Sequence, residues 1–259
     1  MARRNGAEED AATRLYASNQ YDLLVDWLNK VSRTGHKDID PSDGVVEGSL
    51  AFPWSAVSKD KKVTDFWVVL TAGSNLSSGG RHKATDGLGQ VTLDGKSFPA
   101  LLISALGKPG SLKSVSLYKD DRQRRKTFIH EFIHLLDMRR FKGDLANFGA
   151  AQRHGKDQRY YYGSPSEFNA YFQEGAHVLE LMIKDNPEEI WQLSDTEEEF
   201  EAGLDMEDPG EDLEGYDSGT IWSSNFLWSI YDNQGGQRWW KKFVKRAKKL
   251  RIYLINKYQ

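Results

Sequence analysis

Residues able to carry out hydrolytic chemistry occur together in one short segment of this 259-residue chain, His130-Glu131-Phe132-Ile133-His134. On a helix, two histidines four positions apart lie on one face, one turn apart, so both imidazoles can bind the same metal ion. The glutamate between them can reach a metal-bound water, whose pKa zinc lowers to about 7, and can remove its proton. The chain has no cysteine, so imidazoles and carboxylates must supply the ligands. The spacing predicts a zinc site.

Apolar side chains surround this motif and predict that its helix is buried. They are Phe128, Ile129, Phe132, Ile133, Leu135 and Leu136. Two histidines and a glutamate on a buried helix cost free energy unless they are paired or bind a metal. The apolar surroundings therefore favour zinc binding over a chance match to the motif.

A hydrolytic zinc site needs a third protein ligand, and the residues alone leave two candidates. Asp137 lies seven positions after His130, on the same helix face. It can bind the metal, accept a hydrogen bond from a ligand imidazole, or simply end the helix. Glu167 opens a second expected helix, where it can be either a ligand or the partner of Ser164 in a capping box. A third histidine six positions after the pair is excluded, because Arg140 stands there.

The segment from His130 to Asp137, together with Glu167-Phe168-Asn169-Ala170 further along, resembles the gluzincin class of zinc metalloproteases. Within that class it is similar to the catalytic domain of anthrax lethal factor and to the proline-proline endopeptidases. The resemblance covers roughly residues 127 to 183. It implies that Zn²⁺ is held by His130, His134 and Glu167, and that Glu131 is the general base and then the general acid.

The same resemblance implies that a tyrosine upstream of the third ligand assists catalysis. The spacing in the family selects Tyr160, whereas Tyr162 is the tyrosine followed by glycine, as in the family motif. Both stay candidates, and the run from Tyr160 to Tyr162 is equally consistent with packing aromatics. Ile133 stands where the family has a glycine, which indicates a narrower cleft.

Strands precede helices along the chain, which predicts an α+β fold. The resemblance makes this a zincin-like metalloprotease fold with a small sheet, an HExxH active-site helix and a following glutamate-bearing helix. We expect an N-terminal helical segment and polar loop over 1–50, and a catalytic domain over 51–259. The expected helices are 11–31, 126–141 and 165–184, the strands 66–71, 100–105 and 112–118, and the loops 35–48 and 73–89.

The last 22 residues, 238–259, hold nine lysines and arginines and no acid. Their apolar residues Trp240, Phe243, Ala247, Leu250 and Leu254 fall at helical spacing, which predicts an amphipathic helix. Such a helix can bind polyanions or a membrane surface, or it can pack on its own domain. Two adjacent tryptophans suit burial, and the acidic stretch over 195–217 has twelve acids that can attract the basic side chains. Both features favour packing. We therefore expect no sequence-specific nucleic-acid binding.

Composition restricts the remaining possibilities. The formal net charge of −3 argues against a globally basic nucleic-acid coat, and no uncharged apolar run is long enough to cross a bilayer. No secretory signal is recognisable, so we expect a cytoplasmic protein or a part of a phage or toxin particle. The predicted function is zinc-dependent endopeptidase hydrolysis of a protein or peptide substrate. The alternative is a structural or assembly protein of such a particle, with a mainly structural zinc site and a larger assembly as its partner.

Overall fold

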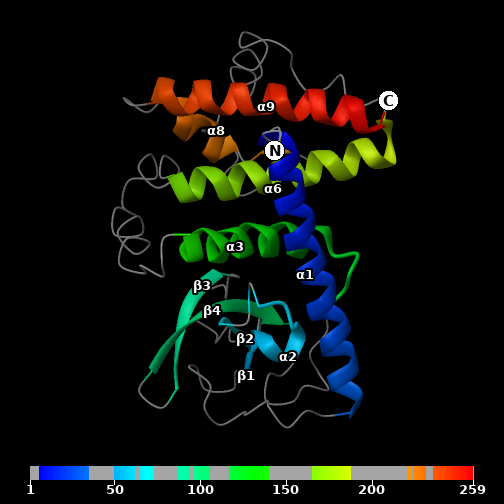
Figure 1. Ribbon diagram of the computed structural model, residues 1–259, viewed down its shortest axis with the longest axis vertical. Helices are drawn as coiled ribbons and strands as arrows, with labels where there is room; N and C mark the ends of the chain where they lie inside the picture. The colour runs from blue at the N-terminus through cyan, green and yellow to red at the C-terminus, as the bar shows by residue number, and fades with distance from the viewer. Residues whose placement is uncertain are drawn as a thin grey trace, which may run out of the picture. The chain divides into compact units, whose positions relative to one another are not determined.

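The computed structural model describes residues 6–34, 50–61, 63, 65–72, 87–93, 96–105, 117–140, 165–187, 221–222, 224–231 and 236–258. It divides into two compact units. The sheet unit comprises residues 16–135, and the helical unit comprises residues 1–15 with 136–259. The division falls inside two continuous helices, α1 (Gly6–Thr34) and α3 (Arg122–Arg140), so each unit contains part of both (Figure 1).

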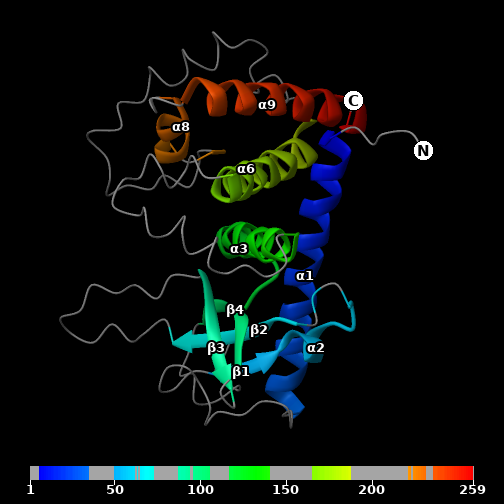
Figure 2. The ribbon, with the colours of Figure 1, turned by 60° about the vertical axis from the view of Figure 1, so that its left-hand side comes forward.

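The sheet unit contains a small mixed sheet. Its strands are β1 (Leu50–Pro53), β2 (Trp67–Ala72), β3 (Gly87–Leu93) and β4 (Lys96–Ala105), in the order β1-β2-β4-β3. The central strands β2 and β4 are parallel, and each outer strand is antiparallel to its neighbour (Figure 2). The central strands carry β-branched and aliphatic residues, which favour extended structure and burial.

Two of the three expected strands are present, because β2 and β4 cover 66–71 and 100–105 except for Phe66. The expected loop over 73–89 is wrong at its end, since residues 87–89 begin β3. Glycines at 87 and 89 weaken the strand signal in the sequence, and pairing with β4 compensates for it. Leu117 and Tyr118, the described end of the strand expected over 112–118, are not in a strand. The loop 35–48 and residues 73–86 and 112–116 lie outside the described residues.

An aromatic cluster in the sheet unit holds the motif-bearing helix α3 in place. Trp54, in the short helix α2 (Trp54–Val57), is fully buried, and its ring lies 5.7 Å from that of Phe132. The Tyr21 ring of α1 meets Phe128 edge-on at 5.3 Å. Gln20 accepts a 3.3 Å hydrogen bond from the Trp54 indole nitrogen. The histidine motif is therefore carried by a helix with a well-packed apolar side.

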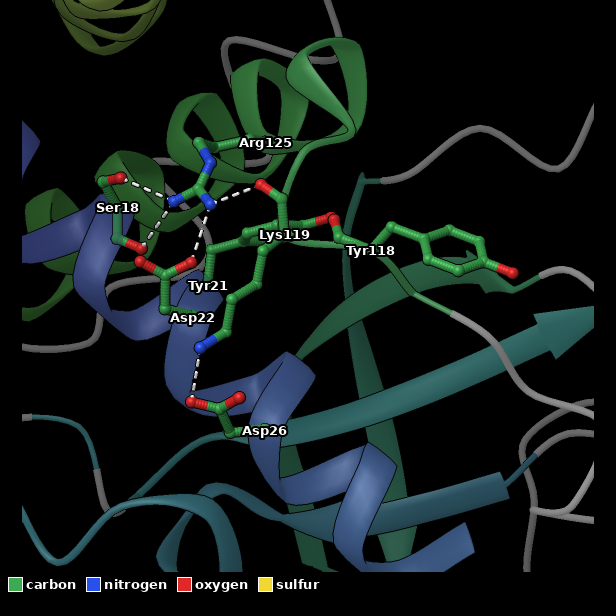
Figure 3. Close-up of polar contacts among 7 residues, drawn as sticks. All are labelled: Ser18, Tyr21, Asp22, Asp26, Tyr118, Lys119 and Arg125. Carbon is green, nitrogen blue, oxygen red and sulfur yellow. Dashed lines mark hydrogen bonds and ion pairs between the residues drawn. The ribbon is translucent and has the colours of Figure 1, made fainter.

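A polar network anchors the first turn of α3 to α1 (Figure 3). The Arg125 guanidinium donates to the Ser18 hydroxyl at 2.8 Å, to the Asp22 carboxylate at 2.6 Å and to the Lys119 carbonyl oxygen at 2.6 Å. Lys119 in turn donates to Asp26 at 2.7 Å. The guanidinium of Arg125 also donates to the Ser18 carbonyl oxygen at 3.3 Å. Because one planar group donates to four acceptor atoms, the beginning of α3 has a defined position against α1.

The helical unit contains α6 (Pro165–Asp185), α8 (Ser224–Tyr231) and α9 (Gly236–Tyr258). These helices share one apolar core with Trp222 and the partly buried Ile221. The stripe expected on the C-terminal helix is confirmed. All five of its members are buried in this core: Trp240, Phe243, Ala247, Leu250 and Leu254. The acidic stretch that the sequence offered as an electrostatic partner lies outside the described residues.

The described part of the chain is thus mostly helical, with a small mixed sheet. The helices expected over 11–31, 126–141 and 165–184 correspond to α1, α3 and α6. Among the helices that the structure describes, none combines the length and the hydropathy needed to cross a bilayer.

Candidate metal centre

His130 and His134 lie one turn apart on α3, and both are buried, with exposed fractions of 6% and 2%. Their Nε2 atoms are 3.1 Å apart, and the two rings meet edge to face with 4.7 Å between centroids. Each ring therefore presents the same nitrogen to the same small region. This is the arrangement that the motif predicts from helix geometry alone.

The distance between the two nitrogens fits a shared ion. Zinc binds imidazole nitrogen at about 2.0–2.1 Å, so two nitrogens at a tetrahedral angle stand about 3.3 Å apart. The observed separation of 3.1 Å is close to that value. Two imidazoles and a carboxylate are also a donor set that zinc accepts in hydrolytic sites. The residues present therefore fit the metal that the motif implies.

Glu131 differs from the two histidines in its surroundings. It lies between them in sequence but on a neighbouring part of the helix surface, and its side chain is only partly buried. By contrast, Phe132 and Ile133 are almost completely buried. A carboxylate with access to water can exchange protons with solvent, whereas one sealed in the apolar core cannot do so readily.

Glu167 lies in the first turn of α6, in the helical unit, and is 3% exposed. Pro165 begins this helix as expected, because proline at the first helical position loses no hydrogen bond. Phe168, next to Glu167, is fully buried in the core of the unit and fixes the register of the turn. Ser164, the other half of the suggested capping box, lies outside the described residues.

Asp137 connects the end of α3 to this first turn of α6. Its Oδ2 accepts a 3.0 Å hydrogen bond from the Asn169 amide nitrogen. Both residues belong to the helical unit, and Asn169 follows Glu167 by only two positions. The last turn of α3 therefore lies beside the turn that carries Glu167. Because α3 is continuous, His134 is one helical turn before this contact.

Among the described residues, His130, His134 and Glu167 form a buried group of side chains that can hold a metal ion. Asp137, the other candidate for third ligand, is not part of that group. The structure thus favours Glu167 where the sequence left a choice. Tyr160 and Tyr162 lie outside the described residues, so the catalytic tyrosine stays a prediction.

Two polar residues near this group were not expected from the sequence. In the sequence, Asn169 is part of the segment that resembles the family motif, and Arg246 is one of nine basic residues in 238–259. The Arg246 guanidinium donates to the Asn169 amide oxygen at 2.8 Å. No local pattern predicts a contact between residues 77 positions apart.

Comparison with known proteins adds no relative. No protein-family model matches the chain, and no curated protein or solved structure shows significant similarity to it. The class of protein is therefore defined by its own features: a mostly helical chain with a small mixed sheet and a buried group of two histidines and one glutamate.

Proposed function

We propose that this protein is a zinc-dependent endopeptidase of the gluzincin type. The observation that supports this most is the buried group of His130, His134 and Glu167, in which the two histidines belong to an H-E-x-x-H motif. In this proposal the three residues hold the ion. Bound zinc would act as a Lewis acid toward a peptide carbonyl and would lower the pKa of a water to about 7.

Glu131 is the proposed general base and then the general acid. Its place between the two ligand histidines keeps it within one turn of both, and its partial exposure leaves it in contact with water. Its carboxylate can take a proton from the attacking water and return it to the leaving amine. A tyrosine, Tyr160 or Tyr162, is proposed to donate a hydrogen bond to the developing oxyanion.

A protein or peptide is the proposed substrate. Within the described sheet, β1 and β3 each have one neighbouring strand, so each presents one unpaired edge. An extended peptide can add to such an edge through main-chain hydrogen bonds. The sheet belongs to the same unit as the histidine pair, which supports a polypeptide substrate over a small molecule.

Substitution of Glu131 by glutamine tests the proposal. The amide keeps the shape of the side chain but cannot accept the proton, so Glu131→Gln should bind one equivalent of zinc and lose at least about 100-fold in peptide hydrolysis, the lower end of general acid–base contributions. Zinc content is measured by elemental analysis and cleavage by profiling of a peptide library. Lys241→Gln, an exposed change on α9, serves as the control and should keep both properties. Purified wild-type protein without stoichiometric metal would disprove the proposal.

A structural zinc protein, a component of a larger assembly, is the second candidate. The nearly complete burial of His130, His134 and Glu167 favours it, because a catalytic zinc site must keep one position open to water and substrate. On this hypothesis Glu131→Gln has no effect on the protein, whereas His130→Ala lowers its melting temperature. Glu131→Gln therefore separates the two functions, because only the endopeptidase loses an activity in this variant.

A further inference from the structure

Four polar side chains from four helices form a continuous chain of hydrogen bonds in the helical unit. Asp137 of α3 accepts from Asn169 of α6 at 3.0 Å, and Asn169 accepts from Arg246 of α9 at 2.8 Å. Arg246 also donates to Asp10 of α1 through Nε and Nη2, at 2.7 and 2.8 Å. We refer to Asp137, Asn169, Arg246 and Asp10 as the polar tie.

We propose that the polar tie positions the metal ligands, with Asn169 and Arg246 as positioning residues; this inference rests on the proposed zinc site. The tie attaches to α3 three residues after His134 and to α6 two residues after Glu167. Each attachment is within one helical turn of a ligand. The hydrogen bond between Asp137 and Asn169 therefore also limits the movement of the neighbouring residues His134 and Glu167.

The Asn169 amide is well suited to this role because both of its ends are used. Its nitrogen donates to a carboxylate, and its oxygen accepts from a guanidinium. Reversing the amide would set its oxygen against Asp137 and its nitrogen against Arg246, two repulsive contacts. The amide therefore has a single favourable orientation, which a simple apolar contact between the helices would not impose.

Arg246 is itself held from two further sides. Its guanidinium makes a two-bond contact with Asp10, and it stacks over the Phe172 ring at 4.1 Å. Phe172 is almost completely buried in the core of the helical unit. The planar group thus has a fixed plane, whereas the ammonium of a lysine at this position has no planar fork with which to bind Asp10 through two parallel hydrogen bonds.

General cohesion of the helices does not account for this arrangement. α6 and α9 share an apolar core, and they are joined a second time by the ion pair of Lys257 with Glu180 at 2.6 Å. The polar tie differs from that pair because it extends to α3. Residues that hold the ligands of a metal site without touching the metal typically change metal affinity about 10- to 100-fold when they are removed.

The test is a zinc titration of the metal-free protein against a competing chelator, with the melting temperature of each metal-free variant measured in parallel. Asn169→Asp keeps the shape and the contact with Arg246 but sets two carboxylates against each other at Asp137. We expect it to lower zinc affinity about 10- to 100-fold. Arg246→Lys should lower it in the same direction. Lys257→Gln, the matched control that removes the ion pair of α9 with Glu180, should leave it unchanged.

A reciprocal exchange tests the bond itself. The combined variant Asp137→Asn with Asn169→Asp restores the hydrogen bond with donor and acceptor exchanged, so it should recover most of the zinc affinity that Asn169→Asp loses. The melting temperature of each variant without metal separates a loss of zinc affinity from a general loss of stability.

Three outcomes would overturn the inference. Unchanged zinc affinity in Asn169→Asp and Arg246→Lys would reduce the tie to a packing feature while leaving the zinc site intact. An exchange variant no better than Asn169→Asp would show that this bond is not what positions the ligands. Absence of zinc binding in the wild type would instead reject the proposed function and this inference together.

Discussion

At the scale of single residues, the two histidines and Glu167 of the candidate site depend on different parts of the chain. The histidines are placed on one face of a single helix by its 3.6-residue period, and their side chains bring the two Nε2 atoms 3.1 Å apart. Glu167 is placed by a second helix, whose first turn is bound to the end of α3 through Asp137 and Asn169. Substitution of Glu167 is therefore informative about the site as a whole.

Glu167→Ala separates a metal ligand from a helix cap. Loss of a capping interaction costs about 1 kcal/mol of stability and leaves metal affinity nearly unchanged. We expect instead a loss of zinc affinity above about 100-fold, the upper limit for partners that do not touch the metal. Chelator competition measures it, and Asp185→Ala, an exposed acid on the same helix, is the control. A variant that keeps its zinc but melts slightly lower would support the capping role and make Asp137 the candidate ligand.

At the scale of elements, close packing between α6 and the segment at Ile221 and Trp222 depends on one glycine. A Cβ at Gly175 would collide with the Trp222 indole and with the Ile221 carbonyl oxygen. The same indole donates a 3.2 Å hydrogen bond to the Phe172 carbonyl oxygen and is 7% exposed. This contact completes the apolar core that α6 shares with α8 and α9.

Gly175→Ala should therefore destabilise the protein even though alanine is the better helix former. Overpacking of this kind costs about 1–3 kcal/mol, more than the roughly 1 kcal/mol gained in helix propensity. Urea unfolding measures the difference in free energy of unfolding. Gly6→Ala is the matched control, because its Cβ would meet nothing within 4 Å, and it should not destabilise the protein. Equal effects at the two sites would show that the contact with Trp222 contributes nothing.

At the scale of the whole molecule, residues from both ends of the chain meet at Glu180 in the helical unit. Arg14 of α1 donates to the Glu180 carboxylate at 3.1 Å, and Lys257 of α9 donates to it at 2.6 Å. Burial by itself would raise the pKa of Glu180, but the two cations outweigh burial and lower the pKa below its ordinary value of 4.5. Burial, the largest single cause, lowers the pKa of Lys257, but the hydrogen bond and charge of Glu180, together with hydrogen bonds to Tyr253 and Tyr258, outweigh burial and raise that pKa.

This lowered pKa predicts how stability depends on pH. An acid whose pKa is lower in the folded state than in the unfolded state stabilises the fold above the unfolded value, and loses this contribution as the pH falls below about 4.5. We expect Glu180→Gln to lower the free energy of unfolding by about 1–3 kcal/mol at pH 7, as for hydrogen bonds to charged groups. Urea unfolding at pH 7 and pH 3 should show that this difference shrinks in acid.

Asp26→Asn is the control for that pH dependence. Its ion pair with Lys119 is largely exposed, with side-chain exposures of 60% and 49%, so solvent screens it and its loss should cost less than about 1 kcal/mol at either pH. A difference for Glu180→Gln that stays constant between pH 7 and pH 3 would contradict the prediction.

Elements with a local pattern were predictable from the sequence. Helix periodicity located α1, α3 and α6, and it located the buried stripe of α9. It also placed His130 and His134 on one face, because positions four apart on a helix are neighbours whatever the rest of the chain does. β1 and β3 were missed, since short or glycine-containing strands depend on pairing with a neighbour more than on their own residues.

The sequence by itself therefore determined the donor types of the candidate site: two imidazoles four positions apart on one helix, and carboxylates as candidates for a third donor, with no thiolate available. Only the tertiary structure decided between Asp137 and Glu167 as third member of the group, and it revealed that Arg246 pairs with Asp10, 236 positions away. The physical reason is the range of the interactions. Helix geometry relates residues within a turn, whereas a contact between distant helices depends on how their apolar faces pack, which no local pattern encodes.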